Sequence, residues 1–164
     1  MFNLRVSQRE FEISLHTSCR VRQGTQAAVK KALKAGLAGI SSTQMNHVLG
    51  KHRHLHLSVS LVSRTKIQEL NAQFRGKNKP TDVLSFSQVE AAIPNAPQVE
   101  LGDLILCPAL ANEQCKTWGA TPAQEIMRLT VHGLLHLFGY DHETNEADAK
   151  KMFRLQEKIL EPIL

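Results

Sequence analysis

One short stretch constrains this chain more than any other: TVHGLLHLFGYDH, which runs from Thr130 to His142. It places three histidines at relative positions 0, +4 and +10, with a glycine at +7. Because residues four apart lie on one face of a helix, His132 and His136 project from the same side, one turn apart. Gly139 then allows a sharp turn that can bring His142 back toward the same point. The stretch therefore predicts a buried helix whose histidine stripe faces a cleft.

Three converging imidazoles predict a metal site of the open, catalytic type. Neutral imidazole is a common zinc ligand, and three protein ligands leave a fourth position for water, whereas structural sites are closed by a fourth residue. With eight histidines in 164 residues, three at these offsets arise by chance roughly 0.02 times per chain. We predict one Zn²⁺ bound by His132, His136 and His142, with a water molecule in the fourth position.

The same histidine spacing occurs in a zinc peptidase motif, H-E-x-x-H-x-x-G-x-x-H, in which the glutamate is the general base. Here that position is Gly133. A metal can lower the pKa of its bound water toward 7, and RNA carries its own nucleophile in the 2′-hydroxyl, so phosphodiester cleavage tolerates the glycine. Peptide hydrolysis tolerates it poorly, because the leaving nitrogen must be protonated. We also expect Gly133 to leave room for a ribose-phosphate backbone near the metal.

Hydrophobic periodicity predicts the remaining elements. Strand patterns cover residues 11–16, 55–63, 82–87 and 102–107, and helix patterns cover 25–37, 65–74, 108–118, 121–138 and a final segment from Asn145. Residues 88–100 contain two prolines and are typical of a surface loop. We expect an α+β fold in a single domain over residues 1–164. A small mixed sheet of about four strands should pack against helices, with the zinc-binding helix in a cleft.

Composition constrains the class of protein less strongly than the histidine stretch does. A net charge of +5 and a pI near 9.3 favour a polyanionic partner. The three cysteines form no C-x-x-C pair, which indicates a reduced compartment. No apolar run approaches the roughly 20 residues of a membrane span, and the charged N-terminus is unlike a signal peptide. We expect a cytoplasmic protein without membrane association. With one Trp and one Tyr, contacts to an RNA backbone should dominate over base stacking.

Three segments of the chain resemble one known family. HGLLHLFGYDH (132–142) is similar to the signature H-G-x-x-H-L-x-G-Y-D-H of the bacterial YbeY endoribonuclease family. LNAQFRGKNKPTDVLSF (70–86) is similar to that family's L-N-x-x-[FY]-R-x-x-x-x-x-T-D-V-L-S-F, and LGDLIL (101–106) matches its third landmark. The resemblance runs from about Leu55 to the C-terminus in the same order, and the first fifty residues carry no signature.

The resemblance implies a metal-dependent, single-strand-specific endoribonuclease that acts in 16S rRNA 3′-end maturation and in ribosome quality control. It implies ribosomal RNA and ribosome-associated proteins as partners, and no DNA. It carries His132, His136 and His142 over as zinc ligands and Arg75 as a functional arginine. We predict that Arg75 and His132 are the catalytic residues. Arg75 suits this role because a planar, permanently charged guanidinium stabilises charge on phosphoryl oxygens.

Several further residues are candidates for supporting roles. The carboxylates of Asp82, Asp103 and Asp141 are candidates to orient the imidazoles. Glu125, two turns before His132, is either a solvated side chain or a remote proton carrier.

Two other functions stay open. One is a zinc peptidase-like hydrolase with a displaced base, and the other is a non-catalytic ribosome-assembly factor with a structural metal. A second histidine group, at residues 52, 54 and 56, fits either a further metal cluster or a solvated basic edge strand, and the edge strand is favoured.

Overall fold

The computed structural model describes residues 1–89, 96–117 and 119–164. In this part of the chain five strands form one mixed sheet in the order β1-β2-β3-β5-β4. The outer pairs, β1 with β2 and β4 with β5, are antiparallel, whereas β2 with β3 and β3 with β5 are parallel. The strands are β1 (Phe2–Val6), β2 (Arg9–Thr17), β3 (His54–Leu61), β4 (Val83–Ser87) and β5 (Val99–Leu106).

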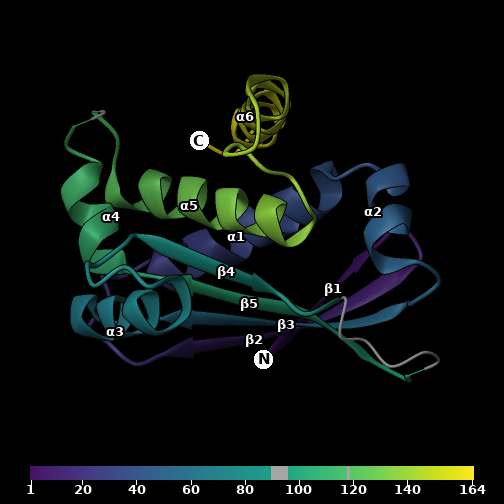
Figure 1. Cartoon of the computed structure of the whole chain (residues 1–164), viewed down its shortest axis with the longest axis horizontal. Helices are drawn as coiled ribbons and strands as arrows, with labels where there is room; N and C mark the ends of the chain where they lie inside the picture. Colours follow the sequence, from purple (N-terminus) through teal and green to yellow (C-terminus); the bar gives the residue numbers. More distant parts are fainter. Residues whose placement is uncertain (90–95, 118) are drawn as a thin grey trace.

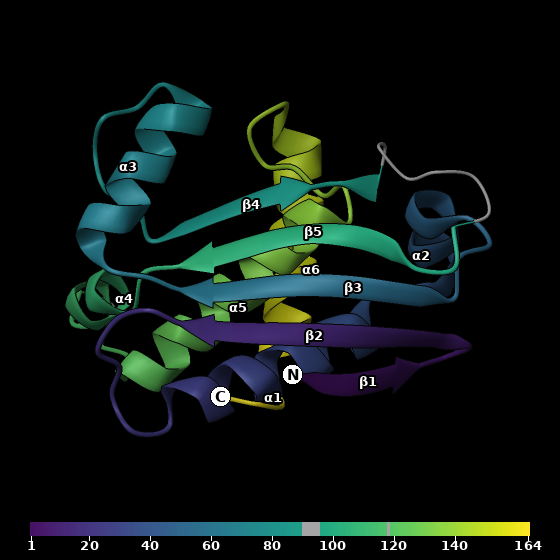
Figure 2. The same ribbon diagram turned by 90° about the horizontal axis from the view of Figure 1, so that it is seen from below.

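Helices cover one face of this sheet. Figure 1 shows α1 and α5 side by side above the strands, with α6 crossing over them. Seen from below, the strands lie in front and these helices behind (Figure 2). The helices are α1 (Thr25–Gly39), α2 (Ser42–Leu49), α3 (Arg64–Arg75), α4 (Pro108–Gln114), α5 (Pro122–Leu137) and α6 (Glu146–Leu160). The predicted α+β class is confirmed.

The structure contains one strand and one helix that the sequence patterns did not predict. Strand β1 makes the sheet five strands wide rather than about four. The alternation of Phe2, Leu4 and Val6 is a weak strand pattern, because charged residues lie between and directly after them. Helix α2 is short and buries only Met45 and Leu49, so its periodicity is weak. The predicted loop 88–100 and the predicted helix end at 118 lie partly outside the described residues.

Helix α5 forms the centre of the core. Its first turn has the predicted capping box, in which Thr121 accepts a hydrogen bond from the backbone of Gln124 and the Gln124 side chain accepts one from the backbone of Thr121. Beyond this turn nearly every side chain is buried against the sheet, α1, α4 or α6. The exceptions recur every fourth residue, at 128, 132 and 136, where the side chains are only half-buried. This stripe is the face that the sequence predicted to line a cleft.

No helix in the described ranges is both long and apolar enough to cross a membrane.

Gly102 allows β4 and β5 to pair closely. Its φ of 144° lies in a region that side chains avoid, and a Cβ there would stand 2.1 Å from the carbonyl oxygen of Phe86 on the neighbouring strand. The pairing register between β3 and β5 also shifts just before this residue, as expected at a bulge. The position therefore requires glycine for two independent reasons, backbone conformation and steric contact.

We predict that Gly102→Ala lowers the free energy of unfolding by about 3 kcal/mol, because backbone strain and a steric contact add. Gly76→Ala is the matched control, since Gly76 also has positive φ but has no atom within 4 Å of the added Cβ. Gly76→Ala should lower the free energy of unfolding by only about 1 kcal/mol. Urea unfolding at constant metal content measures both values, and equal losses in the two variants would contradict the steric contribution.

Candidate metal centre

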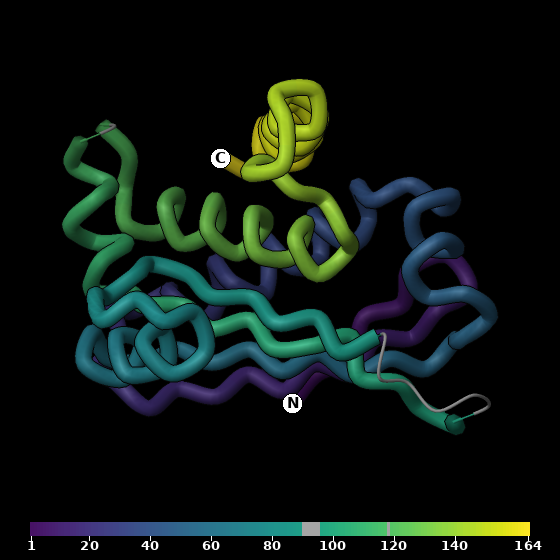
Figure 3. Tube along the Cα trace, viewed as in Figure 1, coloured from purple at the N-terminus to yellow at the C-terminus, as the bar shows by residue number. Residues whose placement is uncertain are grey.

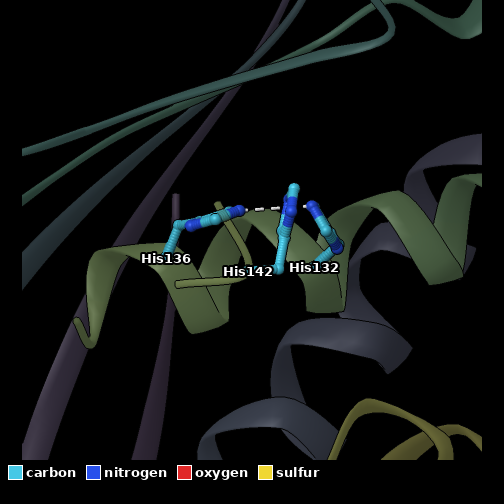
Figure 4. Close-up of side chains that lie close together, drawn as sticks. All are labelled: His132, His136 and His142. Atoms are coloured by element: carbon cyan, nitrogen blue, oxygen red, sulfur yellow. Dashed lines mark hydrogen bonds between the residues drawn. The ribbon is translucent and has the colours of Figure 1, made fainter. Parts of the chain in front are cut away.

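The three predicted ligands come together at the C-terminal end of α5. His132 and His136 project from its open stripe, and the helix ends at Leu137, two residues before Gly139, which has the expected left-handed φ of 78°. Two backbone hydrogen bonds close this turn, from Gly139 to His136 and from Tyr140 to Leu135. The chain thereby returns His142 to the histidine pair, as Figure 4 shows.

The spacing of the imidazole nitrogens fits a single ion. One ligand nitrogen from each of the three histidines can be chosen so that all lie within 4.8 Å of one another. The Nε2 atoms of His132 and His136 are 3.2 Å apart, close to the roughly 3.4 Å expected between two nitrogen ligands on one tetrahedral zinc. Among the His, Cys and acidic side chains of the described residues, His132, His136 and His142 are the ones that lie close enough together to hold a metal.

Burial keeps the imidazoles of His132 and His136 in the neutral form that binds metals. It lowers the pKa of His132 to about 4, an effect that the hydrogen bond from His132 to Gln156 opposes and that the neighbouring His136 reinforces. The pKa of His136 is also lowered, first by burial and then by the charge of His142, with a smaller contribution from Arg75. Both rings are therefore neutral at pH 7, so neither must lose a proton before it coordinates a cation.

Gln156 on α6 orients His132. Its side chain is only 6% exposed, and its Oε1 lies 2.9 Å from Nδ1 of His132. Because a carbonyl oxygen only accepts, Nδ1 must carry the proton, which leaves the Nε2 lone pair free for a metal. The sequence patterns did not identify this residue. One feature of the sequence could have indicated it. Gln156 is a polar residue on the face of α6 that helical periodicity assigns to the core, between Met152 and Ile159.

The carboxylates expected to orient the imidazoles bond elsewhere. Asp82 accepts a hydrogen bond from the backbone of Val83 (2.9 Å), and Asp103 accepts one from Gln88 (2.5 Å). Asp141 accepts one from the backbone of Glu143 at 2.9 Å. Asp141 acts on His136 through its charge alone, which favours the protonated ring. Among the described residues the hydrogen bonds of these three candidates go to other groups, and Gln156 rather than a carboxylate orients His132.

Glu125 is buried in an ion pair rather than solvated. It is 2% exposed, and both of its oxygens accept hydrogen bonds from Arg128, at 2.6 and 3.0 Å. The hydrogen bond to Glu125 is the main reason that the pKa of Arg128 is raised. The interpretation of Glu125 as a solvated side chain is therefore wrong, because Arg128 holds its carboxylate in a bidentate ion pair in the interior.

The second histidine group does not lie on an edge strand. His54 and His56 belong to β3, which is the central strand of the sheet, so the edge-strand prediction is wrong. His56 is held between Ser14 (2.9 Å) and Glu100 (2.7 Å) on the neighbouring strands. These three side chains form a polar network across the face of the sheet that the long helices leave uncovered.

Gly133 faces the sheet rather than open space. A Cβ at this position would stand 2.3 Å from Leu104 and 3.1 Å from Val83, and the residue is buried. The expectation that Gly133 leaves room for RNA beside the metal is therefore wrong. Its small size lets α5 pack closely on strands β4 and β5.

The histidines open into a cleft of about 440 Å³ whose other walls are basic. Arg75, Lys77 and Lys79 line it, together with Asp82 and Glu143. Its remaining lining residues are Asn71, Pro80, Thr81, Val83, Leu84, Ser85, Leu110, Gln114 and the three histidines. The structure thus brings Arg75 and the histidines, more than 50 residues apart in sequence, to one cavity.

Helix α3 and the loop after it position the basic wall. Arg75 is the last residue of α3, and its guanidinium donates a hydrogen bond to the backbone oxygen of Ser85 at 3.3 Å. Its Cζ also lies 5.8 Å from the centre of the Phe86 ring. The buried Asn71 donates to the carbonyl of Lys79 at 2.7 Å, which ties the lysine loop to the helix. The cations therefore stand on an anchored loop.

Fold and site together define a class: an α+β protein with three histidines placed to bind a metal in an open basic cleft. A family model described as Endoribonuclease YbeY matches residues 18–163. The chain belongs to this family.

Individual relatives agree with the family model. A protein named Endoribonuclease YbeY from a Sulfurihydrogenibium species is 47% identical over 110 residues, covering 67% of this chain and 71% of the relative. A protein of the same name from Persephonella marina is 43% identical over 110 residues, with the same coverage of each chain. The solution structure of TM1509 from Thermotoga maritima matches with a TM-score of 0.53 at 28% identity. It covers 92% of this chain and 87% of that chain.

We predict that Gln156→Leu weakens Zn²⁺ binding about 10- to 100-fold, because the Nδ1 proton of His132 loses its acceptor. Gln156→Glu keeps an acceptor oxygen at the same place and should retain affinity within a few-fold. Competition with a chromophoric chelator measures both dissociation constants. Equal affinity for the leucine and glutamate variants would show that the hydrogen bond does not orient the ring.

The lowered pKa of His132 predicts an acid-sensitive metal-free protein. The unfolded chain takes up a proton on this histidine below its ordinary pKa of 6.5, whereas the folded protein does so only near pH 4. Stability is therefore lost as pH falls through this window. Between pH 7.5 and 4.5 the chelated wild type should lose about 2 kcal/mol more than His132→Gln does. The exposed His47→Gln is the matched control in urea unfolding, and identical pH slopes for all three proteins would contradict the assignment.

Proposed function

We propose that the protein is a zinc-dependent endoribonuclease specific for single-stranded RNA, acting in 16S rRNA 3′-end maturation and ribosome quality control in the cytoplasm. One observation carries this proposal: the three histidines and the Arg75, Lys77 and Lys79 side chains line the same open cleft. The matched relatives bear the name of an endoribonuclease, which supports RNA as the substrate. We further propose that residues 1–164 act as one catalytic domain.

His132, His136 and His142 would hold the zinc ion. When bound there, zinc would polarise a phosphoryl oxygen and acidify a water molecule. The neutral state of His132 and His136 and the hydrogen bond from His132 to Gln156 prepare the centre for a cation at pH 7. His132 thus serves as a ligand whose orientation is set by a partner on another helix.

Arg75 would stabilise negative charge on the phosphoryl oxygens. Its guanidinium uses one N–H in the bond to Ser85, which fixes its direction and leaves other donors for the substrate. Lys77 and Lys79, on the anchored loop, would hold the neighbouring phosphates. These contacts favour a polyanionic strand and are independent of base identity.

The structure favours RNA cleavage over peptide cleavage. Among the described residues that line the cleft, the carboxylates are Asp82, which accepts a backbone N–H, and Glu143, which follows His142. Neither stands directly after His132, where the peptidase motif places its base. Glu125 is sequestered by Arg128. A peptidase needs a carboxylate that can pass a proton to the leaving nitrogen, whereas RNA supplies an internal nucleophile. Ribosomal RNA and ribosome-associated proteins are the partners that this proposal implies.

The decisive variant is Arg75→Glu. We expect it to lower kcat/KM on a single-stranded oligoribonucleotide at least 100-fold, with unchanged zinc content, because the charge that faces the phosphoryl group is reversed. Arg75→Lys keeps the charge without the planar fork and should be intermediate. Arg5→Glu, on the exposed edge strand β1, makes the same charge change and should behave as wild type.

Cleavage and zinc content together separate the alternatives. Proteolysis of casein that is lost in His136→Ala, with RNA left intact, would identify a peptidase. Bound zinc and bound RNA without cleavage by the wild type would identify an assembly factor. Cleavage that persists in both Arg75→Glu and His136→Ala would show that another nuclease is responsible.

A further inference from the structure

An exposed aromatic ring stands beside the metal centre. Among the described residues, the large hydrophobic side chains that remain exposed are Met1, Phe74, Phe153 and Leu164. Phe153 is 42% exposed, although its neighbour Met152 is completely buried in the stripe that α6 packs on the core. A single exposed apolar side chain is common on protein surfaces. Phe153 differs from the exposed Phe74, which packs on Phe86, because its ring contacts two of the metal-site histidines.

The ring of Phe153 continues the stack of metal-site imidazoles. Its centroid lies 5.5 Å from that of His142 with an interplanar angle of 26°, and 6.4 Å from that of His132 at 27°. Figure 3 shows how the chain leaves α5, turns, and enters α6. Phe153 on α6 thereby lies within stacking distance of His132 on α5 and of His142 on the turn. The imidazoles hold the ring on one side, and its exposed part offers surface for another flat group.

We infer that Phe153 forms a stacking subsite for one nucleobase of the RNA strand whose phosphate is held at the three histidines. This inference rests on the proposed function and specifies its substrate. Aromatic rings stack favourably at centroid distances of about 4.5–7 Å, and a nucleobase presents a flat π face whatever its identity. The subsite therefore selects an unpaired base without reading its sequence.

The placement of Phe153 would favour a single strand over a duplex. A base within a duplex is already stacked and paired, so it reaches Phe153 only if both interactions are given up. The cations at Arg75, Lys77 and Lys79 line the same cleft as the three histidines and can hold the backbone there. Phe153 lies beside His132 and His142, outside the set of residues that line the cleft. One strand would then pass from the basic cleft across the histidines to this ring. The scarcity of aromatic residues in the chain thus does not exclude stacking at this one position.

The test compares Phe153→Leu, which keeps apolar bulk but has no aromatic face, with Phe153→Trp, which enlarges it. Phe2→Leu, on the distant strand β1, is the matched control. The substrates are a single-stranded oligoribonucleotide and the same oligonucleotide with abasic residues on both sides of the cleavage site. We expect Phe153→Leu to raise KM about tenfold on the first substrate with kcat within twofold, to leave the abasic substrate unchanged, and to keep wild-type zinc content. Phe153→Trp should retain the wild-type KM or lower it.

Binding is read separately from 2-aminopurine placed beside the cleavage site, whose fluorescence should be quenched by wild type and not by Phe153→Leu. This readout needs no cleavage, so a wild-type protein that quenches but does not cleave would refute the proposed function and retain the subsite. Three results would overturn the subsite: wild-type KM and quenching in Phe153→Leu, an equal rise in KM on the abasic substrate, or loss of zinc in that variant. The last would show that Phe153 only shields the histidines.

Discussion

The burial of helix α5 is the constraint on which the rest of the structure depends. Its apolar sides pack on the sheet and on neighbouring helices, so its rotation about its own axis is set by packing. The residues left over recur every four positions, and two of them are His132 and His136. Because removing apolar side chains from water supplies most of the folding free energy, the direction of these imidazoles follows from the stability of the core. The helix presents them to the cleft without requiring a loop to order.

The chemistry of the site comes from elements that are far apart in the sequence. Gln156 reaches His132 from α6, whereas Arg75 reaches the cleft from the end of α3. The first contact sets which imidazole nitrogen is free, and the second supplies a permanent positive charge that also lowers the pKa of His136. The histidines therefore lie between a neutral hydrogen-bonding partner on one side and a cationic wall on the other. Such an arrangement suits an anionic substrate that approaches a cation.

The corrections share one physical cause, which is that a residue's surroundings depend on partners far away in the sequence. Gly133 seemed to open space near the metal, but its missing side chain faces Leu104 on β5. Glu125 seemed solvated, but Arg128 holds it in the interior. His54 and His56 seemed to lie on an edge, but parallel pairing with both β2 and β5 places their strand at the centre of the sheet. In each case the residue spacing read from the sequence was correct, but the predicted surroundings of the side chain were wrong.

The sequence by itself determined the class of fold, most of the helices and strands, the histidine triad and the arginine opposite it. These depend on short-range rules: periodicity that matches a helix or a strand, a capping box at Thr121, and a left-handed glycine at 139. Only the tertiary structure decided the order of the strands, the role of Gln156, the burial of Glu125 and the stacking of Phe153 on His142. Those features join residues on different elements, and no local pattern specifies which elements will touch. They arise when the apolar faces of sheet and helices are buried together.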